Sequence, residues 1–293
     1  MSTSQYVKLN QDSGAFRKDI GSYNSATPFF KAIFDACRFD QFNNRDSNGP
    51  IRLMDAMSGP GKLGKDILKM YNEQKPESGK DLHVFFNDKL DNPLSLLTRE
   101  GFDTIKCDVR ELGGSSQKFD IIAVRYGLKD LPKDQIPLAL NSLRASLLPD
   151  GLLVIGDMTA YTLNGQRSVI ELHSAKQELA GRDSKTEGIC HIPTVGEWER
   201  LLVDSNFSNL KTYTNFTSDV ETSQWGGQFG SKDTPEKTAL ERDLEFIGRL
   251  DDLTHELAKS SPTFCSEFRI KFSADNKVFI KFPILVISGE KRQ

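Results

Sequence analysis

The spacing of apolar positions changes along the chain and indicates where regular structure begins. Between residues 51 and 157, short apolar runs alternate with amphipathic segments, which is the pattern of βαβ units around a mostly parallel sheet. We expect strands at Ile51–Ala56, Leu82–Phe86, Thr104–Cys107, Phe119–Val124 and Leu152–Gly156. The clearest helix is expected at Gln135–Leu148, ending at a Pro-Asp-Gly turn.

The flanking regions carry helical and extended patterns as well. Phe30, Ile33 and Phe34 share one face of a helix expected near the N-terminus. A polar region with a helix around 166–179 precedes a capping box at Thr194–Glu197, whose helix should bury Trp198, Leu201 and Leu202 and end near Asn206. Long strands are expected at Leu210–Val220 and Lys277–Ser288, with an amphipathic helix from Thr234-Pro235 between them.

The amino-acid composition indicates which classes of protein the chain can belong to. The 293 residues are 37% hydrophobic, enough for a substantial core. The net charge of -3 creates no overall positive field that would attract nucleic acid, and a local basic patch is the alternative that this total leaves open. The four cysteines form no C-x-x-C pair, which favours reduced thiols in a cytoplasmic protein. Neither a signal peptide nor an apolar run of the roughly 20 residues that a membrane helix needs is visible, so we expect no membrane association.

A glycine-containing loop directly follows the first expected strand. The segment runs Asp55-Ala56-Met57-Ser58-Gly59-Pro60-Gly61-Lys62, and a helix is expected after it. Glycine permits positive φ angles and close backbone approach, so such a loop can bring a ligand against a helix N-terminus. Taken alone, the loop also fits a dinucleotide-binding protein or an ordinary tight turn.

Asp55, Gly59, Pro60 and Gly61 together resemble the first motif of class I S-adenosylmethionine (SAM) dependent methyltransferases. In that family an acidic residue ends the first strand and alternating glycines follow. Met57 stands where the family has its first glycine, so we expect a slightly wider loop or weaker SAM binding. The resemblance implies that Asp55, Met57, Gly59 and Gly61 bind the cofactor.

Two further acidic residues follow expected strands. Asp88 ends the second, where a carboxylate can accept both ribose hydroxyls of a nucleoside; the alternative is that it caps the next helix. Asp108 ends the third, where the resemblance implies that its carboxylate receives the adenine amino group and that the backbone of Val109 contacts the ring. With Asp55, three acids thus lie at carboxyl ends of consecutive strands, where open α/β sheets bind ligands.

The fourth expected strand extends the resemblance. It ends in Arg125-Tyr126-Gly127-Leu128, and the Tyr-Gly-Leu is similar to the Phe-Gly-Leu of quinone-biosynthesis methyltransferases. We expect Arg125 beside the cofactor and Tyr126 at the acceptor site as a catalytic candidate. An ordinary core or rim aromatic residue is the alternative for Tyr126.

The resemblance covers residues 50–160 well and the C-terminal strands more loosely. It implies a Rossmann-like, doubly wound α/β fold with a mostly parallel seven-stranded sheet, an antiparallel last strand and a helical insertion. We expect a helical lid segment at residues 1–50 and a SAM-binding domain at residues 51–293. The insertion is expected at about 221–276, where the family usually has a short hairpin loop.

Methyl transfer from SAM is an in-line displacement that mainly requires correct positioning, so few catalytic side chains are needed. A general base is required only for a weakly acidic hydroxyl or a protonated amine. His173 and His191 lie in the region after the fifth strand that often lines the acceptor pocket in this family. Each can be the base, or a surface or hydrogen-bonding residue. Nothing in the sequence requires a metal.

The sequence therefore predicts methylation of an O, N or C atom of a small organic molecule. No Asp/Asn-Pro-Pro-aromatic motif follows the fourth strand, which further argues against nucleic acid as acceptor. One alternative is a non-catalytic SAM-fold sensor or interaction subunit. Another is an NAD(P)-dependent oxidoreductase, whose fingerprint lacks the acid that Asp55 places just before the glycines. A homodimer is also possible, through the amphipathic helix of the insertion.

Overall fold

The computed structural model describes residues 28–45, 49–167, 170, 191–221, 269–272 and 278–292. Helices α2 (Pro28–Ala36) and α3 (Phe39–Asn43) precede the first strand. Strands and helices then alternate as β1 (Ile51–Ala56), α4 (Lys62–Gln74), β2 (Leu82–Asp88), α5 (Asp91–Arg99), β3 (Asp103–Lys106), η3 (Leu112–Gly114), β4 (Phe119–Arg125), η4 (Leu128–Asp130), η5 (Lys133–Gln135), α6 (Ile136–Ser146) and β5 (Leu147–Met158). The described C-terminal elements are α8 (Val195–Asp204), β6 (Phe207–Glu221), β7 (Arg269–Phe272) and β8 (Val278–Lys291).

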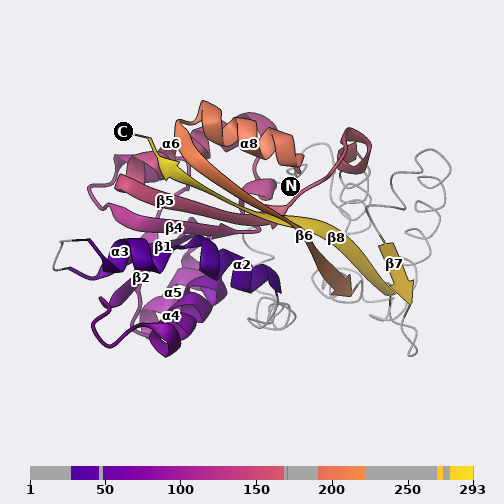
Figure 1. Ribbon diagram of the computed structural model, residues 1–293. Helices are drawn as coiled ribbons and strands as arrows, with labels where there is room; N and C mark the ends of the chain where they lie inside the picture. The colour runs from indigo at the N-terminus through magenta and orange to yellow at the C-terminus, as the bar shows by residue number, and fades with distance from the viewer. Residues whose placement is uncertain are drawn as a thin grey trace. The chain divides into compact units, whose positions relative to one another are not determined.

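The strands form one mixed sheet in the order β3-β2-β1-β4-β5-β8-β6 (Figure 1). Strands β1 to β5 pair in parallel, and the last strand, β8, is antiparallel. Helices α6 and α8 cover one face of the sheet, and α2, α4 and α5 cover the other. The predicted seven-stranded, doubly wound fold is thereby confirmed. Strand β7, which pairs with β8, is an addition that the sequence did not predict.

Residue contacts divide the chain into two compact units. One comprises residues 23–157, 196–214 and 285–293, and therefore contains the five parallel strands together with α2 and α3. The other comprises residues 1–22, 158–195 and 215–284. The helices expected around 166–179 and from Thr234 lie largely or wholly outside the described residues. In the part of the chain that is described, no helix has the length and apolar character needed to cross a membrane.

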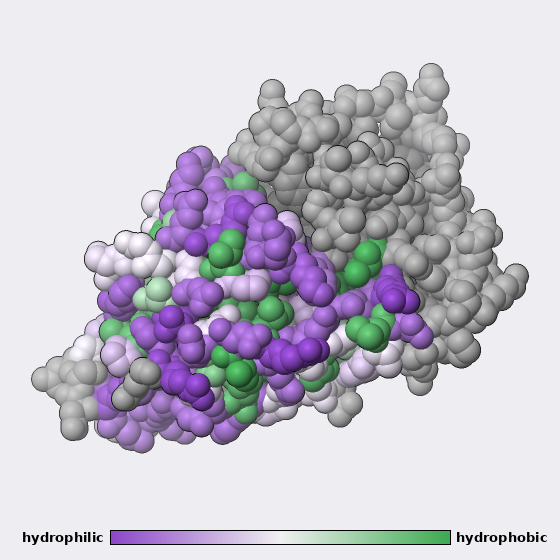
Figure 2. All heavy atoms as spheres, turned by 90° about the horizontal axis from the view of Figure 1, so that it is seen from above, coloured by the Kyte–Doolittle hydropathy of each residue, from purple (hydrophilic) through white to green (hydrophobic). Residues whose placement is uncertain are grey.

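The central strands form the core because helices exclude water from both of their faces. In β4, every residue from Phe119 to Val124 is buried, and β1 is buried except at Arg52. On the side of α6 and α8, the surface is mostly polar and its apolar side chains form small, separate groups (Figure 2). The exposed Leu138 and Val203 lie on these two helices.

Two predicted helices are present as α2 and α8, with small differences from the prediction in α8. Helix α2 buries Phe30, Ile33 and Phe34, as its spacing predicted. Helix α8 buries Trp198 and Leu202, whereas Leu201 is only half-buried, and the helix ends at Asp204. The predicted position of Leu201 in the core is therefore only partly correct.

The predicted boundary between α6 and β5 was wrong. Helix α6 ends at Ser146, and β5 begins at Leu147, before the Pro-Asp-Gly sequence. The pairing with β4 shifts from Phe119–Leu147 to Ile121–Leu152, so the intervening residues of β5 form a bulge. Asp150 lies in this bulge with a φ of 59°. A turn sequence was thus accommodated within the strand.

Helix α4 lies so close to β2 that only glycine fits at two positions. A Cβ atom on Gly61, the residue before α4, would lie 2.8 Å from Phe86 Cε1 on β2, and one on Gly64 would lie 2.6 Å from the same atom. Gly61 also has a φ of 76°. These two contacts set the position of the α4 N-terminus relative to the sheet.

We expect Gly64→Ala to destabilise the protein by about 1–3 kcal/mol, because α4 must move away from the aromatic ring on β2. Urea unfolding measures the change. The matched control is Gly196→Ala in α8, where an added Cβ meets nothing within 4 Å and alanine's helix propensity should leave stability unchanged or higher. Equal effects of the two substitutions would contradict the close packing of α4.

Candidate functional site

The loop between β1 and α4 turns back over the carboxyl end of the sheet. Met57, Gly59 and Gly61 have φ angles of 56°, 51° and 76°, so all three lie in the left-handed region. The Ser58 N–H donates to the Asn87 carbonyl at 2.8 Å, and the Gly61 N–H donates to the Ser58 carbonyl at 2.9 Å. Met57 therefore adopts the backbone conformation that glycine adopts without steric cost.

Asp88 joins this loop to the end of β2. Its Oδ2 accepts the Gly59 N–H at 2.9 Å, and its Oδ1 accepts the Leu90 N–H at 3.0 Å. Each carboxylate oxygen accepts up to two hydrogen bonds, so each keeps one acceptor position after these contacts. The predicted glycine loop and the predicted ribose-binding acid are thus in direct contact.

Asp55 lies beneath the loop and is only 1% exposed. Its Oδ2 accepts the Gly64 N–H, in the first turn of α4, at 2.8 Å. Burial raises the pKa of Asp55 to about 7, Asp88 adds to this rise, and the Gly64 hydrogen bond and the charge of Arg125 oppose it. In this structure Asp55 therefore anchors the loop and helix from inside.

The end of β4 packs against Met57. A Cβ atom on Gly127 would lie 2.8 Å from Met57 Sδ, so glycine is required there for close approach. Tyr126 has a φ of 55°, and its ring lies 5.5 Å from that of Phe29 on α2, centroid to centroid. Met57 and Tyr126, two non-glycine residues in the left-handed region, thus directly follow the neighbouring strands β1 and β4. Such backbone strain is common at functional sites.

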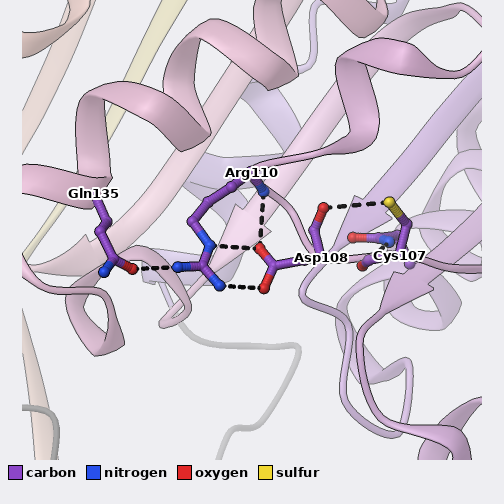
Figure 3. A network of polar contacts seen from close by, with 5 residues as sticks. Cys107, Asp108, Arg110 and Gln135 are labelled. Atoms are coloured by element: carbon purple, nitrogen blue, oxygen red, sulfur yellow. Dashed lines mark hydrogen bonds and ion pairs between the residues drawn. The ribbon is translucent and has the colours of Figure 1, made fainter.

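The loop after β3 carries a polar network around Asp108 (Figure 3). Asp108 Oδ1 accepts the Arg110 backbone N–H at 3.0 Å and Nε–H at 2.8 Å, while Oδ2 accepts from Arg110 Nη2 at 2.6 Å. On its other side, Arg110 Nη1 donates to Gln135 Oε1, just before α6. The Arg110 guanidinium holds the pKa of Asp108 below its usual range.

Asn87 fixes the same loop from β2. Its fully buried amide donates to the carbonyls of Ile105 and Cys107 at 3.0 and 2.9 Å. Sequence reasoning identified Asp88 and Asp108 but missed the roles of Asn87, Arg110 and Gln135. The proximity of Arg110 to Asp108 in sequence was a usable signal. Gln135 gave none, because its role depends on where α6 packs.

The remaining predicted residues have different positions. Val109 is buried, and Arg125 ends β4 half-buried. His191 is 9% exposed in the compact unit that includes residues 158–195. His173 lies outside the described residues. Among the residues that the structure describes, no group of three His, Cys, Asp or Glu side chains is arranged to hold a metal.

We expect the stability of the wild-type protein relative to Asp55→Asn to fall as the pH rises from about 4 to about 7. The folded-state pKa of Asp55 is about 7 against an ordinary value of 3.8, so the folded chain holds a proton that the unfolded chain releases in this window. An asparagine oxygen can still accept the Gly64 N–H without a buried charge. Urea unfolding at several pH values measures the difference; a difference that is constant across the window would contradict the pKa shift.

Comparison with known proteins shows the fold. No family model and no curated protein sequence matches the chain. The YcgJ protein from Bacillus subtilis superposes with a TM-score of 0.61 at 13% identity, over 90% of this chain and 98% of that one. A provisionally assigned methyltransferase from Bacillus halodurans gives a TM-score of 0.57 at 14% identity, over 88% and 99%.

A third similar structure was solved with S-adenosylhomocysteine bound. The Haemonchus contortus phosphoethanolamine N-methyltransferase 2, in complex with phosphomonomethylethanolamine and S-adenosylhomocysteine, superposes with a TM-score of 0.50 at 13% identity. The match covers 100% of this chain and 59% of that one. With the sheet order and the glycine loop described above, these likenesses show that the chain has the fold of class I SAM-dependent methyltransferases.

Proposed function

We propose that the protein binds SAM and transfers its methyl group to an O, N or C atom of a small organic molecule. One observation carries the proposal: the Gly59 N–H bonds to Asp88 Oδ2 at 2.9 Å. This contact brings the glycine loop and the acid of β2 to one point at the carboxyl end of the sheet, where open α/β folds bind nucleotides.

In the proposed complex, the open acceptor positions of Asp88 receive the two ribose hydroxyls. The carboxylate of Asp108 and the backbone of Val109 contact the adenine ring. Met57, Gly59 and Gly61 provide the backbone surface for the rest of the cofactor, and Arg125 lies at the adjoining end of β4. Asp55 contributes indirectly, because its contact with Gly64 positions the loop.

The proposed reaction needs little help from side chains. A lone pair of the acceptor forms a bond to the methyl carbon while the carbon–sulfur bond breaks and its electrons remain on sulfur, giving S-adenosylhomocysteine. The acceptor atom then loses its proton to a base or to water when it carries one. Tyr126 is our candidate for lining the acceptor site, and His191 and His173 are the candidates for a base.

Nucleic acid is not the proposed acceptor, because the net charge of -3 provides no overall positive field to attract a phosphate backbone. It also differs from two alternatives that the same fold permits. A sensor or interaction subunit would bind SAM without turnover, and an oxidoreductase would bind a nicotinamide cofactor instead.

The first test is isothermal titration of the ligand-free protein with SAM, S-adenosylhomocysteine, NADH and NADPH in parallel. We expect binding of the two adenosyl ligands alone. Binding of a nicotinamide cofactor, or of none of the four by folded protein, would contradict the proposal. Transfer of a radioactive methyl group from SAM to members of a small-molecule panel then separates an enzyme from a sensor.

Asp88→Ala is expected to weaken SAM binding more than about tenfold, because the charge-assisted contacts to the ribose hydroxyls are lost. Isothermal titration of the folded variant measures the loss. Asp91→Ala, which removes an exposed carboxylate three residues away that pairs with Lys106, is the control and should bind as the wild type does. Unchanged affinity in the Asp88 variant would remove this residue from the site.

Met57→Gly is expected to leave the fold intact and to preserve or improve SAM affinity. Glycine adopts the φ of 56° at this position without the steric cost that methionine bears. Circular dichroism and isothermal titration check the two parts of the prediction. Loss of binding in a folded variant would instead make the methionine side chain part of the cofactor pocket.

A further inference from the structure

The Asp108 carboxylate accepts more hydrogen bonds than are needed to hold a loop residue in position. Three hydrogen bonds reach this one carboxylate, and all three come from Arg110. The guanidinium is in turn held by Gln135, which lies next to α6 on a different part of the fold. Figure 3 shows Arg110 between the two side chains, with its planar group facing the Asp108 carboxylate.

These contacts use up most of the acceptor capacity of Asp108. A carboxylate has about four lone-pair positions, two on each oxygen. Oδ1 accepts from the Arg110 backbone N–H and Nε–H, so both of its positions are occupied. Oδ2 accepts only from Arg110 Nη2 and keeps one position. The side chain of Asp108 is 17% exposed, so this remaining position is the chief polar function that it can offer a ligand.

The two parallel bonds also fix the plane of the carboxylate. A guanidinium that binds through Nε and Nη2 aligns with both carboxylate oxygens, which a lysine ammonium cannot do. Gln135 prevents the guanidinium from rotating away. The direction of the open position on Oδ2 is therefore set by Arg110 and Gln135 together.

We propose that Arg110 is a positioning residue that leaves Asp108 one fixed acceptor position and thereby makes the site select a 6-amino purine over a 6-oxo purine. This inference rests on the proposed function. An adenine amino group donates one N–H to the open position of Oδ2. A hypoxanthine ring presents an oxygen there instead, and its lone pairs face those of the carboxylate.

The test compares the affinities of S-adenosylhomocysteine and S-inosylhomocysteine, which differ only in the purine, by isothermal titration. The wild type should prefer the adenosyl ligand by at least about tenfold, because a charged hydrogen bond is lost with the oxo ligand. In Arg110→Ala and Arg110→Lys this preference should fall to about threefold or less. Arg99→Ala, an exposed arginine at the end of α5, is the control and should keep the wild-type preference.

A double-mutant cycle separates positioning from general structural support. Asp108→Asn should abolish the preference, and adding Arg110→Ala to it should cause no further change. Melting temperatures identify variants that fail to fold, and Gln135→Ala, which leaves the ion pair in place, then provides a milder test with a partial loss of preference.

Several outcomes would overturn the inference. Survival of the preference in folded Arg110→Ala or Arg110→Lys, or an equal loss of affinity for both ligands, would indicate a purely structural role. Tighter adenosyl binding by Arg110→Ala would show that Arg110 competes with adenine. If the wild-type protein binds neither ligand, the proposed function itself fails and this inference fails with it.

Discussion

The hydrogen bond from the Gly59 N–H to Asp88 is the contact on which the candidate site depends, because it joins the loop after β1 to the end of β2. Beneath it, Asp55 accepts the Gly64 N–H and holds α4 to the same loop. The Gly64 bond requires the first turn of α4 to lie close to the sheet, where a Cβ atom on Gly61 or Gly64 would lie less than 3 Å from the Phe86 ring on β2. The geometry of the candidate site therefore depends on the glycine positions of the backbone as much as on the acidic side chains.

Met57 and Tyr126 adopt strained backbone conformations at the same end of the sheet. They directly follow the neighbouring strands β1 and β4, where the chain leaves the carboxyl end of the sheet, and both have positive φ angles. Contacts hold them there: Met57 packs against Gly127, and the Tyr126 ring packs against Phe29. The cost of a left-handed non-glycine residue, about 1 kcal/mol or more, is small beside the burial of the surrounding strands.

Most of the parallel strands could be predicted from sequence because β1, β2 and β4 contain short apolar runs followed by turn or polar residues, and β1 has the predicted bounds. The start of β5 could not, since its bulge depends on pairing with β4, which lies far away in sequence. Strand β7 lacks an apolar run and forms by pairing with β8. In the site, the acids were found by their positions after strands. Their partners Arg110 and Gln135 were not, because they meet only through tertiary packing.

The three acidic residues near the strand ends, Asp55, Asp88 and Asp108, differ in their burial and in their ion pairing. This difference suits them to different roles. Burial raises the pKa of Asp55, which suits an internal anchor better than a ligand contact. The Arg110 guanidinium forms an ion pair with Asp108. The Asp108 carboxylate can therefore accept a hydrogen bond in a fixed direction, but its charge contributes little to the electrostatic field at a distance. Asp88 accepts hydrogen bonds from the Gly59 and Leu90 backbone N–H groups, and no ion pair involves it among the residues that the structure describes. Of the three, it is therefore the acid whose carboxylate is neither buried nor paired with a guanidinium in the described part of the chain, and in the proposed complex it is the acid best suited to contact the cofactor.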